Sequence, residues 1–207
     1  MNDKKSRKIS GGAYTILLQD HFELLRRAYE SYLVLESFGG LLVNVHQGDP
    51  EYPRVYFFTN LIFATASAAF DSYVINLHKF FDRQSHDLES LVDVGVKRGA
   101  LPPWLEAIIR EKIKNAASSA ANKHIDSLRN RNVGHYQISN QEHSPLTNVN
   151  PTSEEVREYF ARIGEILKLC ADHAPLPNSP FRYNQFEPQI TDTAKMAIGY
   201  FRGEKAP

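Results

Sequence analysis

The run VYFFTNLIFATASAAFDSYVINLHKFF, residues 55–81, decides the fold expected for this chain. It contains no Gly or Pro and is long enough for about seven helical turns. Apolar side chains occur on nearly every side of that helix, and polar side chains are few. A helix of this kind is central in a fold or buried at an interface. The segment HQGDPEYPR just before it, with one Gly and two prolines, sets its start.

A second helix is predicted upstream, over residues 15–38. Its apolar residues recur every three or four positions, which is the spacing of one helix face: Leu18, Phe22, Leu25, Tyr29 and Tyr32. Gly39 and Gly40 then provide a stop signal.

Two more long helices are predicted downstream. Pro102 and Pro103 suit the first turn of a helix over residues 104–132, and Thr152 with Glu155 forms a T-x-x-E capping box for a helix over residues 152–173. The middle of the first of these, NAASSAAN (115–122), has only small side chains, so we expect it to pack closely against the helix over residues 55–81. A short amphipathic piece, HDLESLVDVGVKRG (86–99), precedes both.

These patterns predict an all-α protein, a four-helix up-and-down bundle with short additional helices. The expected organisation is a flexible N-terminal tail over residues 1–13, the bundle over residues 14–174, and a Pro-rich extension with a short helix over residues 175–207. No strand pattern and no internal repeat is found in the sequence.

Composition limits the classes of function. Lys+Arg and Asp+Glu are both 24, so the chain has no overall charge that would attract nucleic acid, and such binding requires a local patch. The single cysteine, Cys170, excludes an intrachain disulfide and fits a cytoplasmic protein with a buried thiol rather than a nucleophile. The longest apolar stretch, LIFATASAAF, is too short to span a bilayer, so no membrane partner is expected. No Gly-rich phosphate loop and no HExxH-type histidine pair is found, so we predict no cofactor and no metal.

The chemically richest stretch is LRNRNVGHY, residues 128–136. Arg129 offers a charged planar fork that matches phosphate oxygens, and His135 can take or give a proton near neutral pH. Asn130 is expected to support them, and Arg131 to contact a phosphate. On an ideal helix Arg129 and His135 lie about 120° apart, which is unfavourable for one chain acting alone.

The predicted helix that carries this stretch is locally basic. Between Trp104 and His135 the six basic residues are Arg110, Lys112, Lys114, Lys123, Arg129 and Arg131, and the three acidic ones are Glu106, Glu111 and Asp126. This excess favours an anionic ligand. The alternative is that these side chains only solvate the outer face and complement the helix dipole.

A polar stripe on the helix over residues 55–81 is a second candidate. Its members share one narrow face: Asn60, Ser67, Asp71, His78 and Asp82. The stripe could line a substrate cleft, with Asp71 orienting a histidine or an arginine. We favour the simpler interpretation that it is a water-facing edge on which His78 and Asp82 pair.

The stretch RNRNVGH at the end of a long third helix resembles the signature of the HEPN superfamily (higher eukaryotes and prokaryotes nucleotide-binding), an Arg followed by a polar residue, four to six positions before a His. Arg129-Asn130 and His135 match it. The segment FATASAAFDSYVINLHKFFDRQSHDLESL is similar to the abortive-infection branch of that superfamily. The resemblance covers roughly residues 14–173.

This resemblance implies a metal-independent endoribonuclease that acts as a homodimer, with Arg129 and His135 of both copies lining one cleft. Toxin and antiviral-defence roles, with an antitoxin or other regulatory partner, belong to the same expectation. Members paired with a nucleotidyltransferase antitoxin carry a Tyr two residues after the His, where this chain has Gln137. We therefore do not predict that pairing, and Tyr136 is expected to pack or to stack on the substrate. The alternatives are a catalytically silent module that binds RNA or a nucleotide, and a non-enzymatic helical dimerisation scaffold.

Overall fold

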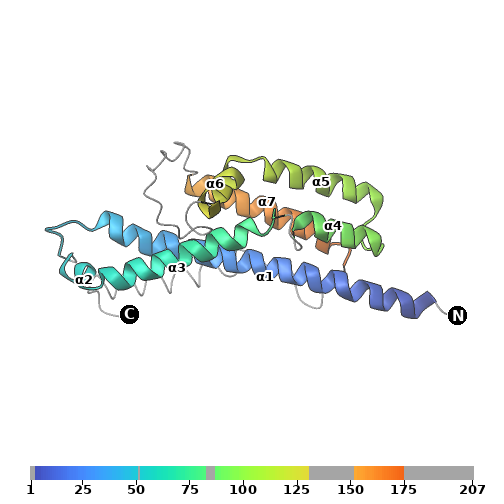
Figure 1. Cartoon of the computed structure of the whole chain (residues 1–207), viewed down its shortest axis with the longest axis horizontal. Helices are drawn as coiled ribbons and strands as arrows, with labels where there is room; N and C mark the ends of the chain where they lie inside the picture. Colours follow the sequence, from blue (N-terminus) through green and yellow to red (C-terminus); the bar gives the residue numbers. More distant parts are fainter. Residues whose placement is uncertain (1–2, 51, 83–86, 131–151, 175–207) are drawn as a thin grey trace. The chain divides into compact units, whose positions relative to one another are not determined.

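The computed structural model describes residues 3–50, 52–82, 87–130 and 152–174, and all regular secondary structure among these residues is helical. The helices of this described part are α1 (Asp3–Asn44), α2 (Tyr52–Phe57), α3 (Thr59–His78), α4 (Leu88–Lys97), α5 (Pro103–Ala117), α6 (Ala120–Leu128) and α7 (Ser153–Ala171), as labelled in Figure 1. The prediction of an all-α chain is confirmed for these residues. The up-and-down order of the bundle stays a prediction, and the extension over residues 175–207 lies outside the described residues.

The described chain divides into two compact units. The first unit holds the described residues up to Leu25 and from Val74 onward, and the second unit holds those from Arg26 to Tyr73. Helices α1 and α3 therefore each contribute residues to both units.

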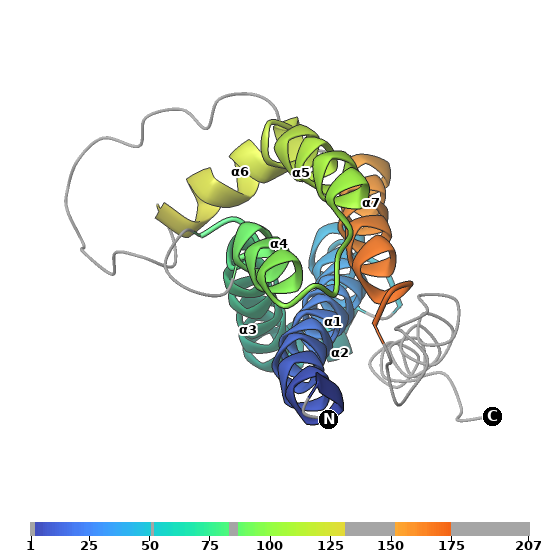
Figure 2. The same ribbon diagram turned by 90° about the vertical axis from the view of Figure 1, so that its right-hand side faces the viewer.

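In the first unit, α5 packs against α4 and α7, and α6 packs against α7 and α5. Figure 2 shows α5 alongside α7, with α4 on the other side of α5. Each of these helices directs one apolar face inward, as their periodicity requires. The largest fully buried side chains of this unit include Tyr14, Leu18, Phe80, Leu91, Ile109, Tyr159 and Phe160.

Two close contacts connect Tyr14 of α1 to this core. The Tyr14 hydroxyl donates a hydrogen bond to the backbone carbonyl of Cys170 in α7, at 2.9 Å. Gly95 of α4 lies so close to Tyr14 and Leu101 that a Cβ atom would come within 2.8 Å of the Tyr14 ring and 2.7 Å of the Leu101 side chain. A glycine is therefore required for α4 to approach this closely.

The prediction of one helix over residues 104–132 is wrong, because the helix is interrupted at Ser118 and Ser119, between α5 and α6. The Ser119 side chain accepts a hydrogen bond from the backbone N–H of Asn122 and so caps α6. The Asn122 side chain donates to the carbonyl of Ala117 at 3.0 Å. Side chains that satisfy the backbone in this way compete with helical hydrogen bonds. The small residues here form a helix break, and the buried side chains of Ala116 and Asn122 adjoin α7.

The prediction of one helix over residues 55–81 is also wrong, because α2 ends at Phe57 and α3 runs from Thr59 to His78. The Thr59 hydroxyl donates to the carbonyl of Val55 at 3.0 Å, which is a bond that bends helices. Around this break lies the small core of the second unit, in which Phe38, Tyr52 and Phe58 pack against Val45, Val55 and Ile62. Leu61 and Phe63 are more than half exposed, so α3 is not buried all round by this chain.

Helix α1 is longer than predicted at both ends. It begins at Asp3, inside the segment for which the sequence predicts a flexible tail, and it continues through Gly39 and Gly40 to Asn44. Each glycine costs a helix about 1 kcal/mol relative to alanine. That cost does not end a helix that good helix formers continue on both sides.

The helix predictions over residues 86–99 and 152–173 are confirmed. Helix α7 begins after Thr152, whose side chain accepts from the backbone N–H of Glu155, while the Glu155 side chain accepts from the Thr152 N–H. Helix α4 begins after Asp87, which caps it by accepting from the Ser90 N–H at 2.8 Å. Among the residues that the structure describes, no helix has the length and apolarity to cross a bilayer.

Candidate functional site

The end of α6 presents the first two residues of the predicted motif. Ile125 and Leu128 are buried and fix one face of α6 on the core, and after Leu128 the chain continues through a wider, π-type turn at residues 129–130. Arg129 is half-buried, and its guanidinium Nη1 donates to the side-chain oxygen of Asn130 at 3.1 Å. Asn130 itself is exposed. The two side chains therefore form a small polar group at the solvent edge of the first unit.

Among the described residues, no carboxylate balances the positive charge of Arg129. None of the described carboxylates forms an ion pair with its guanidinium, and its hydrogen-bond partner Asn130 is neutral. Asp126 lies three residues earlier, on the same side of the helix. Its carboxylate is engaged by His78 instead.

His78 connects the end of α3 to α6 within the first unit. Its Nδ1 lies 3.0 Å from the Asp126 carboxylate, and its Nε2 lies 3.6 Å from the carboxylate of Asp82. The side chain of His78 is only 18% exposed. The pairing of His78 with Asp82 is as predicted, whereas Asp126 lies 48 residues away and no sequence signal points to it.

A buried polar network holds α6 on α7. The Tyr159 hydroxyl donates to the Asn122 side-chain oxygen at 2.6 Å, and both residues are buried. Since Asn122 also donates to Ala117, its amide is satisfied on both sides. This network fixes the direction in which α6 leaves α5, and it therefore fixes where Arg129 lies.

The local excess of basic residues is largely neutralised on α5. Arg110 forms ion pairs with the carboxylates of Glu89, Asp93 and Glu106. The hydrogen bond to Asp93 is the main cause that raises the pKa of Arg110 above its ordinary value. Lys112 pairs with Glu165 at 2.9 Å. Sequence counting along one predicted helix missed Glu89, Asp93 and Glu165, because they come from α4 and α7.

The other predicted site residues lie in the second unit or outside the described residues. Asp71 is half-buried on α3 in the second unit, as is Ser67, and Asn60 is exposed there. Arg131, His135 and Tyr136 lie outside the described residues. The pairing of Arg129 with His135 therefore stays a prediction.

Two further titratable groups have shifted pKa values. Burial raises the pKa of the Cys170 thiol to about 12, which makes it a poor nucleophile at neutral pH. Burial lowers the pKa of His124 on α6. No group of three His, Cys, Asp or Glu side chains within the described ranges could hold a metal ion.

Comparison with known proteins gives no relative: no family model, no curated protein and no solved structure matches this chain.

Proposed function

We propose that the chain is a metal-independent endoribonuclease of HEPN type, in which Arg129 binds the scissile phosphate and His135 moves the proton. The observation that supports the proposal is that Arg129, at the end of α6 beside the amide of Asn130, has no carboxylate partner among the described residues. An arginine with no carboxylate partner among the described residues can donate two hydrogen bonds from its planar guanidinium to a phosphate.

The chemistry uses the substrate's own nucleophile. The 2′-oxygen forms a bond to phosphorus as the bond from phosphorus to the 5′-oxygen breaks, which leaves a 2′,3′-cyclic phosphate and a free 5′-hydroxyl. One group removes the 2′-hydroxyl proton and another protonates the 5′-oxygen. His135 serves as one of them. The resemblance to the HEPN superfamily supplies the second as His135 of another copy, in a composite site.

Arg129 stabilises the negative charge that develops on the phosphorane oxygens. Asn130 holds the guanidinium through its side-chain oxygen. The contact of His78 with Asp126 supports the end of α6 from α3. Arg131 and Tyr136 are proposed to contact the RNA, and a toxin or antiviral-defence role with an antitoxin partner is part of the same proposal.

The test is RNA cleavage by the purified full chain in EDTA. We expect wild type to release a 2′,3′-cyclic phosphate from RNA and to leave DNA of the same sequence intact. Arg129→Ala and His135→Ala should each lower the rate by about 100-fold or more. Lys123→Ala is the matched control, because it removes an exposed positive charge from the same helix.

The control variant should cleave at the wild-type rate, and circular dichroism should show equal helicity in all variants. Equal cleavage by wild type, Arg129→Ala and His135→Ala would overturn the proposal. Binding of RNA by wild type without any cleavage would support the catalytically silent module instead.

A further inference from the structure

The second unit exposes several large apolar side chains at the junction of α2 and α3. Tyr56 is 68% exposed, Phe57 79% and Leu61 55%. No charged residue occurs between Arg54 and Asp71 in the sequence. Single exposed apolar residues are ordinary, whereas a group of large ones without charges marks an interaction surface.

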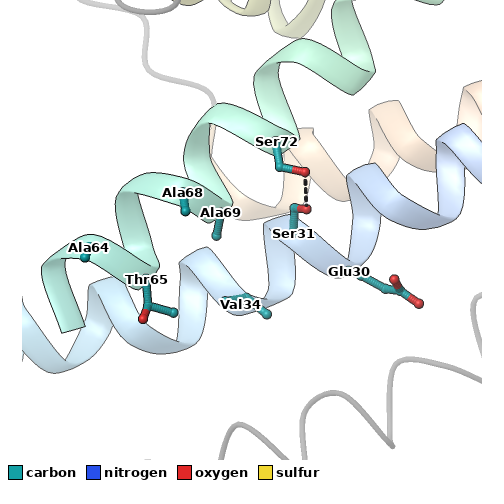
Figure 3. Close-up of a pocket in the computed structure, with 8 residues that line it drawn as sticks. All are labelled: Glu30, Ser31, Val34, Ala64, Thr65, Ala68, Ala69 and Ser72. Carbon is teal, nitrogen blue, oxygen red and sulfur yellow. Dashed lines mark hydrogen bonds between the residues drawn. The ribbon is translucent and has the colours of Figure 1, made fainter. Parts of the chain in front are cut away.

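An open hollow lies next to this group, between α1 and α3 of the same unit. Its volume is about 580 Å³, and small side chains of α3 form one wall, namely Ala64, Thr65, Ala68, Ala69 and Ser72. Glu30, Ser31 and Val34 of α1 form the other wall, and a 2.8 Å hydrogen bond between Ser31 and Ser72 connects the two (Figure 3). We call this space the alanine hollow.

Side-chain size changes along one face of α3. At 100° per residue, Leu61, Ala64, Ala68 and Ser72 lie on the same face of the helix. The large residue comes first and the small residues follow. If a second α3 lay antiparallel across this face, with a two-fold axis between Ala64 and Thr65, Leu61 of each copy would meet Ala68 of the other.

We infer that this face of the second unit binds a second copy of the chain, with Phe57 and Leu61 of each copy entering the alanine hollow of the other. An interface with two-fold symmetry must be self-complementary. A face that has large side chains at one end and small side chains at the other meets that requirement.

The size of the surface indicates the strength of the association. Complete burial removes about 150–250 Å² per aromatic side chain from water. Covering Tyr56, Phe57, Leu61 and the hollow on both copies therefore buries on the order of 1,000 Å², which is near the lower limit for a specific interface. The dimer is weak and reversible, with a Kd on the order of micromolar.

The composite site of the proposed function already needs a second copy, and this inference adds the surface that binds it; the surface is expected to bind whether or not the chain cleaves RNA. The same aromatic side chains could stack on bases. The absence of charge between Arg54 and Asp71, and the aliphatic Leu61 at the centre of the face, favour a protein partner over a phosphate backbone.

Analytical ultracentrifugation of the full chain without RNA, over a concentration series around the micromolar range, tests the inference. Wild type should pass from monomer to dimer as concentration rises. Leu61→Ala leaves a void against Ala68 of the other copy, and Ala68→Leu creates a clash with Leu61 of the other copy. Each single variant should raise the Kd about tenfold or more.

The double variant Leu61→Ala/Ala68→Leu exchanges the two sizes and should restore the wild-type Kd. Phe63→Ala is the matched control, because Phe63 is as exposed as Leu61 but lies on another side of α3, and it should leave the Kd unchanged. A monomer at every concentration, an equal effect of Phe63→Ala, or no restoration in the double variant would each overturn the inference. Association only when a short RNA is added would assign the aromatic side chains to RNA stacking and also overturn it.

Discussion

Arg110 and Arg129 belong to the same unit and were counted together as one basic patch, yet their surroundings are opposite. Arg110 is held by three carboxylates from α4 and α5, namely Glu89, Asp93 and Glu106. Arg129 has only the neutral oxygen of Asn130 as a described partner. The charge of Arg110 is compensated within the fold, whereas no described carboxylate compensates the charge of Arg129.

Because two arginines of the same predicted helix have such different partners, a count of basic residues does not locate an anion site. An arginine with carboxylate partners already has its field compensated locally, and a phosphate would have to displace those partners. Only an arginine without such partners contributes its full attraction. The comparison predicts that Arg110 matters for stability and that Arg129 matters for binding.

The largest effect on stability is expected at the buried polar network that holds α6, the helix that leads to Arg129, on α7. Asn122→Ala removes the partner of the buried Tyr159 hydroxyl and of the Ala117 carbonyl at the break between α5 and α6. Buried polar groups without partners cost about 1–3 kcal/mol each. Urea unfolding should therefore show a loss of that size for Asn122→Ala. Asn115→Ala, which changes an exposed amide on α5, should lose far less, and equal losses would contradict the role of the network.

The next effect separates the two arginines directly. Arg110→Met leaves three carboxylates without their cation, and about a third of the Arg110 side chain is exposed. Solvent screening limits each such pair to less than about 1 kcal/mol, so we expect a total loss of about 1–2 kcal/mol of unfolding free energy. Arg129→Met should stay within about 0.5 kcal/mol of wild type. If chemical denaturation gives the two variants the same loss, the contrast between the two sites fails.

A smaller effect is expected at the contact next to Arg129. Asp126→Ala removes a hydrogen-bond partner of the half-buried His78 and should lower the unfolding free energy by about 0.5–1 kcal/mol. The matched control is Asp20→Ala, an exposed aspartate of α1 in the same unit. Thermal unfolding followed by circular dichroism measures both variants. If Asp20→Ala lowers the unfolding free energy as much as Asp126→Ala does, the conclusion that His78 supports the end of α6 is contradicted.

The smallest effect concerns pH and His124 of α6. Burial lowers the pKa of folded His124 below its ordinary value of 6.5, so the unfolded chain takes up the proton first as the pH falls. Stability from the neutral imidazole is complete above pH 6.5 and is lost as the pH falls toward the lower folded pKa. Urea unfolding at pH 7 and pH 5.5 should therefore show a smaller pH-dependent loss for His124→Leu than for wild type. His46→Leu, which alters an exposed histidine, should show the same pH-dependent loss of unfolding free energy as wild type. If His124→Leu also shows the wild-type loss, the lowered pKa of His124 is contradicted.

Local signals in the sequence were sufficient for part of the fold. The capping box of Thr152 and Glu155 predicted the start of α7, and the amphipathic piece before Gly99 predicted α4. The breaks at Phe58 and at Ser118-Ser119 were not predicted. Ser119 and Asn122 cap the second break locally, but Tyr159, which holds the Asn122 side chain, lies 37 residues away, so a local window contains only part of the cause.

The same reasoning applies to the site. Pairs four residues apart on one helix, such as Glu106 with Arg110 and His78 with Asp82, follow from helical geometry. Asp126 reaches His78, and Glu89 reaches Arg110, only through packing between helices. The availability of Arg129 is likewise a property of the packed chain, because it depends on which carboxylates lie near it.

The most direct test of the central claim is RNA binding as a function of salt, measured by fluorescence anisotropy in a His135→Ala background that prevents cleavage. Arg129→Gln should weaken binding of a short single-stranded RNA about tenfold, and it should reduce the slope of log K against log salt concentration by about 1, since one phosphate contact is lost. Arg110→Gln should leave both the affinity and the slope at the values of the background. Equal weakening by the two substitutions, or an unchanged slope for Arg129→Gln, would contradict the claim that Arg129 is the arginine available to RNA.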